Sequence, residues 1–153
     1  MQQVLIDICP DKVWANTFNS VPFWRQVFHV VYFIDFWMRE SYEIDKEWHV
    51  MFFDDAYTPD LDAENFDGLF IAKASMAEYL EKIQIKTTKI FDGLNDKILR
   101  ETIAFENSEF TYADIISTQI RHIMYNIGYL NGILRCLGLP ESDWFAYNEA
   151  EGS

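Results

Sequence analysis

Apolar and polar residues alternate at helical spacing in two long segments of the first two-thirds of the chain. The segment from Pro22 to about Tyr42 carries apolar residues on several faces, which predicts a helix buried on more than one side. From Ser75 to Phe91, apolar residues recur every three to four positions with charged residues between them, and Gly93 follows as a breaker. This pattern predicts an amphipathic helix with one face on the core.

The last third of the chain predicts the longest helix. Thr111 with Asp114 three residues later forms an approximate capping box, which marks a helix start. Isoleucine and leucine then recur at helical spacing until Gly138 and Pro140 end the run. With a shorter helix near the N-terminus, these segments predict an all-α bundle of four main helices within residues 1–140.

The remaining segments are strongly acidic. The segment from Glu40 to Asp67 contains ten acidic residues and one basic residue, Lys46. This composition predicts a long, solvated connection after the second helix that could cover a site. Within it, Trp48 to Phe53 is a short candidate strand with no obvious partner. Residues 141–153 carry four acids and no base, and we expect them to form an acidic C-terminal tail.

Composition limits the classes of function. The 153 residues carry a net charge of -13, from 12 Lys and Arg against 25 Asp and Glu, so phosphate backbones and anionic lipid would be repelled. We therefore expect neither nucleic acid nor a membrane surface as a partner. Cys9 and Cys136 form no CxxC pair, which argues against a zinc knuckle or a disulfide framework. The first residues lack the basic start of a secretory signal, and we expect a cytoplasmic protein.

Three polar side chains on predicted helices could converge on a metal ion. His122 and Asn126 lie four residues apart on one face of the last helix, and His29 lies on the predicted second helix. If the two helices face each other, two imidazoles and one amide oxygen would hold one side of a divalent ion. The alternative is that each histidine is a buried side chain with an ordinary hydrogen bond. His49 lies in the acidic connection and is interpreted as solvated.

Two of these helices also carry a family resemblance. The segments PFWRQVFHVVYFIDFW and TYADIISTQIRHIMYNIGYLNGILR resemble the DinB-like (DinB/YfiT) superfamily, over about Asp11 to Gly138. That family has an up-down-down-up four-helix bundle in which a His on the second helix and an HxxxH pair on the last bind a divalent metal. The resemblance implies that His29 and His122 are ligands, with Asn126 where the second His of the pair would stand.

Because Asn126 replaces a histidine of the family's metal site, two hypotheses of function remain open. An amide oxygen is a weaker ligand than imidazole for zinc or nickel, so the resemblance implies a weakened site for zinc, nickel or manganese. The first hypothesis is a metal-dependent enzyme of thiol-dependent S-transferase or hydrolase type, acting with a small-molecule substrate or a low-molecular-weight thiol. The second is a non-catalytic protein that binds a small molecule or a partner and has lost tight metal binding.

The resemblance also implies a homodimer. The predicted first helix is short, so Phe23 or Trp24 on the next helix would leave apolar surface for a second copy to cover. The sequence leaves open the substrate, the metal, and whether the acidic connection moves as a lid.

Overall fold

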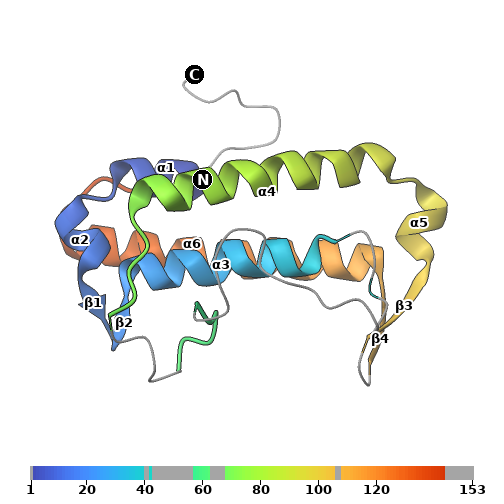
Figure 1. Ribbon diagram of the computed structural model, residues 1–153, viewed down its shortest axis with the longest axis horizontal. Helices are drawn as coiled ribbons and strands as arrows, with labels where there is room; N and C mark the ends of the chain where they lie inside the picture. Colours follow the sequence, from blue (N-terminus) through green and yellow to red (C-terminus); the bar gives the residue numbers. More distant parts are fainter. Residues whose placement is uncertain (1, 40–41, 43–56, 63–67, 106–107, 144–153) are drawn as a thin grey trace.

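The computed structural model describes residues 2–39, 42, 57–62, 68–105 and 108–143. This part of the chain is mostly helical (Figure 1). Its helices are α1 (Gln2–Ile8), α2 (Asp11–Ala15), α3 (Phe23–Trp37), α4 (Lys73–Gly93), α5 (Asp96–Arg100) and α6 (Tyr112–Cys136). Its strands are β1 (Thr17–Phe18), β2 (Val21–Pro22), β3 (Thr102–Phe105) and β4 (Ser108–Thr111).

Three long helices lie side by side. Figure 1 shows α3 and α4 running in the same direction, whereas α6 and the short α1 run the opposite way. Helix α3 packs against both α4 and α6, and α1 packs against α4 and α6 near one end of the molecule. The four helices therefore surround a shared core, and α3 contributes most to it.

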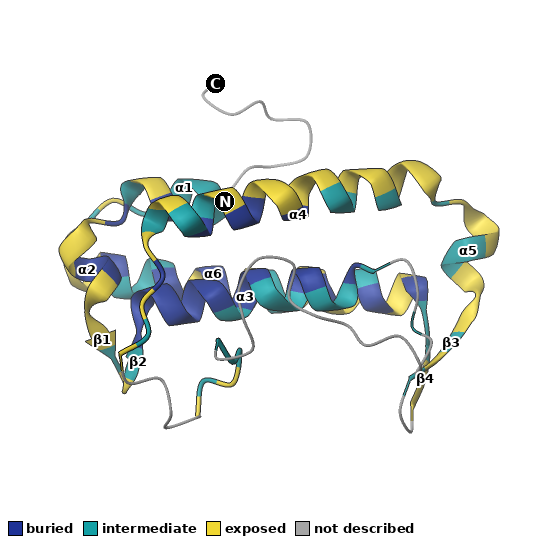
Figure 2. Ribbon diagram, viewed as in Figure 1, coloured by how far each residue is buried: buried dark blue, intermediate teal, exposed yellow. Residues whose placement is uncertain are grey.

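The burial of α3 explains why its sequence is apolar on several faces. Ten of its fifteen residues are buried, among them Phe23, Phe28 and Val31 at 0% exposure. Helix α4 instead buries one stripe and exposes its outer face, as Figure 2 shows. The core is closed at one end by Trp14, whose indole N–H donates to the Ile71 carbonyl at 2.7 Å.

The two later long helices confirm their sequence predictions. Helix α4 extends two residues beyond the predicted 75–91 at each end. At the start of α6, the Thr111 hydroxyl accepts from the Asp114 N–H at 3.2 Å, and the Asp114 carboxylate accepts from the Thr111 N–H at 2.8 Å. Gly138 follows the helix with a φ of 68°, the left-handed conformation that suits glycine.

The structure differs from the prediction in three respects. Helix α3 ends at Trp37 and not near Tyr42: Met38 has left the helical conformation, with φ -92° and ψ 72°, and the Tyr42 hydroxyl donates to the Trp37 carbonyl. Pro10 divides the first helical segment into α1 and α2, since it lacks the N–H that a helix interior needs. The domain is also not purely α-helical, because two antiparallel hairpins join β1 to β2 and β3 to β4.

Part of the acidic connection and most of the tail lie outside the described residues. The candidate strand at Trp48 to Phe53 belongs to that part. The beginning of the predicted tail is held to α6: Ser142 is buried, its N–H donates to Asn131 Oδ1 at 3.0 Å, and Arg135 forms an ion pair with Glu141. Among the helices of the described residues, none is long and apolar enough to cross a membrane.

Candidate metal centre

The packing of α3 against α6 brings two of the predicted ligands together. His29 lies in the middle of α3 and His122 in the middle of α6, and their Nε2 atoms are 3.0 Å apart. The ring of Phe33, one turn after His29, packs edge-on against both imidazoles, with ring centres 4.9 and 5.5 Å away. Helices α3 and α6 therefore face each other with the two histidines between them, which is the condition that a shared site requires.

A backbone carbonyl orients His29. Its Nδ1 lies 2.8 Å from the carbonyl oxygen of Pro59, which accepts a hydrogen bond but has none to donate. Nδ1 therefore carries the proton, and in the neutral ring Nε2 carries the lone pair that faces His122. Burial lowers the pKa of His29, while the Pro59 carbonyl and Asp60 act in the opposite direction.

His122 is half-buried and less completely bonded. Burial lowers its pKa, and the nearby His29 lowers it further, so both rings are neutral at pH 7. The Nδ1 atom of His122 is buried and has no hydrogen-bond partner among the described residues. If His122 donates from Nε2 to His29, this Nδ1 is an unsatisfied acceptor; if both Nε2 atoms face an ion, it is an unsatisfied donor.

Asn126 lies one turn further along α6, but its side chain is already engaged. It is 3% exposed, its amide nitrogen donates to the His122 carbonyl at 2.9 Å, and its oxygen accepts from Gln26 Nε2 at 2.5 Å. Gln26 is also buried and comes from α3, one turn before His29. The oxygen that was expected to ligate a metal therefore links the two helices.

The two histidines fit a divalent ion better than the full predicted set does. Metal–nitrogen bonds of about 2.0–2.1 Å place two ligating nitrogens roughly 2.9–3.4 Å apart, which includes the spacing seen here. Asn126 would ligate only through its second lone pair or after Gln26 had moved. Within the described ranges, no group of three or more His, Cys, Asp and Glu side chains could hold a metal.

A small apolar pocket lies where the end of α3 and strand β4 meet the first part of α6. It has a volume of about 120 Å³, close to what a single small ring needs, and Trp37, Phe110, Ile115 and Gln119 are among its lining residues. Gln119 lies one turn before His122, and within the part of the chain that the structure describes its buried Oε1 has no hydrogen-bond partner. Of two aromatic residues on α3, Trp37 thus borders this pocket, whereas Phe33 packs on the histidines.

Two residues that contact the site were not predicted from the sequence. The only indication for Gln26 was its position three residues before His29, which places both on one side of the predicted helix. Pro59 carried none, since its contribution is a backbone carbonyl from a distant connection. His49, the remaining histidine, lies outside the described residues.

Comparisons of the chain with protein-family models, curated proteins and solved structures gave no match.

Proposed function

We propose that this chain is a DinB-like helical domain that binds a divalent metal through His29 and His122, and that it acts as a metal-dependent enzyme of thiol-dependent S-transferase or hydrolase type. The observation that carries the proposal is the 3.0 Å approach of two imidazole nitrogens from separate helices. The directions of α1, α3, α4 and α6 in Figure 1 agree with the up-down-down-up order of that family.

In this proposal the surrounding residues keep both rings ready to bind. The Pro59 carbonyl holds the Nδ1 proton of His29 and leaves Nε2 free. Burial keeps both imidazoles neutral, and a neutral ring is the form that ligates. Phe33 covers the pair from one side and limits access of water. A bound ion would supply Lewis-acid activation of a thiol or of water.

A specific observation favours the alternative, a non-catalytic protein that binds a small molecule. The oxygen of Asn126 accepts a hydrogen bond from Gln26. In the described ranges, Nδ1 of His122 also lacks the partner that ligating histidines almost always have. Both features weaken a metal site, while the cavity beside Gln119 would remain available to a ligand.

Metal content separates the two proposals. Untagged protein, purified without chelator, is titrated with zinc, nickel and manganese and then analysed for bound metal. Near-stoichiometric metal that is lost in His29→Ala and His122→Ala, and kept in the matched control His49→Ala, supports the metal site. Metal far below stoichiometry at micromolar supply, or equal loss in the control, contradicts it.

Restoring the third imidazole tests how Asn126 limits the site. Position 126 is 3% exposed and in contact with Gln26, so a larger ring there needs space. We expect Asn126→His combined with Gln26→Ala to raise metal affinity tenfold or more, and Asn126→His alone to raise it less. Isothermal titration with nickel measures both variants. Equal affinities in the wild type and the double variant would show that position 126 does not face the ion.

The homodimer prediction now rests on the family resemblance alone, because the exposed apolar surface expected at Phe23 or Trp24 is not found. Phe23 and Trp24 are buried against the chain's own core, at 0% and 3% exposure. Light scattering would decide the oligomeric state.

A further inference from the structure

Residues 57–62, here called the strap, are the main described portion of the acidic connection. The strap is shaped by its own short-range hydrogen bonds. The Thr58 hydroxyl accepts from the Asp60 N–H at 3.2 Å, and Asp60 Oδ1 accepts from the Asp62 N–H at 3.0 Å. Pro59 between them has a fixed φ. These features form a compact turn, from which the carbonyl groups of Pro59 and Asp60 reach α3.

The strap contacts one face of α3 at three points. The Tyr57 ring lies edge-on to Phe28 with ring centres 6.2 Å apart, and the Pro59 carbonyl accepts from His29 Nδ1 at 2.8 Å. The next carbonyl, that of Asp60, accepts from Arg25 Nη2. Phe28 and His29 lie one turn after Arg25 on the same side of α3, so the Arg25 contact adjoins the His29 contact.

The burial of Arg25 requires an explanation. Arg25 lies in the first turn of α3 and is 1% exposed. Removing a guanidinium from water costs free energy unless the charge is paired or hydrogen-bonded. Burial lowers its pKa, and the charges of Asp60 and Asp62 oppose that effect. Among the described residues, the strap supplies partners that offset this cost.

We propose that Arg25 is a positioning residue: by holding the Asp60 carbonyl it fixes the adjacent Pro59 carbonyl on His29 Nδ1, and so determines which nitrogen of His29 is protonated. The importance of this role for metal binding rests on the proposed function, but the protonation pattern itself exists without metal. When Pro59 accepts from Nδ1, His29 presents a lone pair at Nε2. When the strap is released, the proton is free to move to Nε2, and His29 then donates to His122.

The experiment reads the tautomer directly. Protein labelled with ¹⁵N-histidine is studied without metal at pH 8, where two-bond nitrogen–proton correlations distinguish an Nδ1–H ring from an Nε2–H ring. Arg25→Met removes the contact with Asp60, and Arg25→Lys keeps a single donor of different reach. Arg100→Met, at the exposed end of α5, is the control for loss of one positive charge. Circular dichroism verifies the fold of each variant.

The wild type and Arg100→Met should show His29 protonated at Nδ1. Arg25→Met should shift the population toward Nε2–H, and Arg25→Lys should shift it less in the same direction. If Arg25→Met fails to fold, the Lys variant alone decides. A wild type protonated at Nε2, or folded Arg25 variants that keep the wild-type tautomer, would overturn the proposal.

Nickel titration of the same proteins separates this proposal from the proposed function. Outer-shell partners of ligating histidines typically contribute about 10- to 100-fold in metal affinity, so Arg25→Met should weaken binding at least tenfold. If the wild type binds no metal, the metal proposal fails while the tautomer result still decides the role of Arg25. If metal binds equally to the wild type and Arg25→Met and the tautomer is unchanged, only the role of Arg25 is refuted.

Discussion

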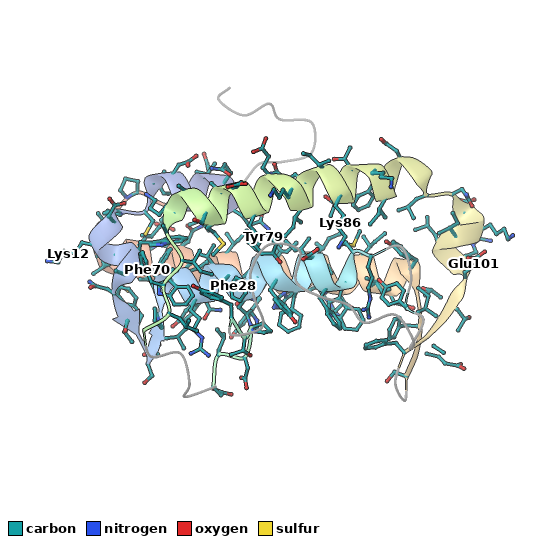
Figure 3. All side chains as sticks on the ribbon, in the orientation of Figure 1. Lys12, Phe28, Phe70, Tyr79, Lys86 and Glu101 are labelled. Atoms are coloured by element: carbon teal, nitrogen blue, oxygen red, sulfur yellow. The ribbon has the colours of Figure 1, made fainter. Side chains whose placement is uncertain are left out.

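Lys86 on α4 pairs with Asp35, a carboxylate buried near the end of α3, and its replacement by methionine should strongly destabilise the fold. Lys86 Nζ donates to Asp35 Oδ1 at 2.6 Å and to the Asp35 backbone carbonyl at 2.7 Å. That carbonyl is one of the last four of α3, which lack partners within the helix. Tyr79 donates to the other carboxylate oxygen at 3.0 Å. Figure 3 shows Tyr79 and Lys86 between α4 and α3.

The size of the loss follows from burial. The side chain of Asp35 is 1% exposed and that of Lys86 20%. With an effective dielectric constant of about 20, charges 2.6 Å apart attract by roughly 6 kcal/mol, from which the desolvation of both groups is subtracted. Removing one partner of a buried pair typically costs about 3–5 kcal/mol. Because Tyr79 still donates in the variant, we expect Lys86→Met to lower the free energy of unfolding by about 3 kcal/mol.

Urea unfolding at pH 7 measures this change. Lys82→Met is the matched control, since Lys82 lies one turn earlier on α4 and pairs with Glu78 at an exposed position; it should change stability by about 0.5 kcal/mol or less. Adding Asp35→Asn to Lys86→Met should recover part of the loss, because an amide carries no unpaired charge. A loss below about 1 kcal/mol in Lys86→Met would refute the reasoning.

Two further predictions concern α6 and the cysteines. Thr111→Ala should lower stability by about 1 kcal/mol because it removes the N-cap hydroxyl, whereas the exposed Ser117→Ala on the same helix should have little effect in urea unfolding. Hydrogen bonds from Thr111 lower the pKa of Asp114 in the folded protein. Their contribution to stability is therefore fully present above the ordinary aspartate pKa of about 3.9 and is lost as the pH falls through the lower folded value. The difference in unfolding free energy between wild type and Thr111→Ala should shrink over the same fall in pH. Burial raises the pKa of Cys9 to about 11, so iodoacetamide at pH 8 should label the exposed Cys136 alone, and mass spectrometry of Cys136→Ser should find no label.

The elements that the sequence predicted are those whose signals are local. The capping pair at Thr111 and the isoleucine repeat after it require no knowledge of the rest of the chain, and α6 follows them closely. The end of α3 was not predicted, because the helical pattern continues toward Tyr42 whereas the chain leaves the helical conformation at Met38. The hairpin of β3 and β4 carried an alternating signal at Ile103 and Phe105, but four-residue strands are too short to stand out from a connection.

In the candidate site too, the sequence predicted what local spacing determines and missed what depends on contacts between helices. His29 and His122 were found because helical spacing and the family resemblance placed both on facing surfaces of two helices, and they lie within hydrogen-bonding distance. Asn126 was assigned from its spacing to His122 and from its place in the HxxxH pair of the family it resembles. Spacing fixes the face of a helix but not the partner of a side chain, and the buried Gln26 on the neighbouring helix engages its oxygen. The metal itself stays a prediction.

The polar residues of α3 explain how such an apolar helix keeps one orientation. Hydrophobic contacts are weakly directional, and a helix buried on several faces could rotate against its neighbours at low cost. Gln26 bonds to Asn126 on α6, His29 contacts His122 on α6, and Asp35 binds Lys86 on α4. Rotating α3 would leave several buried polar groups unsatisfied at once, at about 1–3 kcal/mol each. The contacts that orient the histidines are therefore also those that fix α3 between α4 and α6, so substitutions in the site should be judged against measured stability.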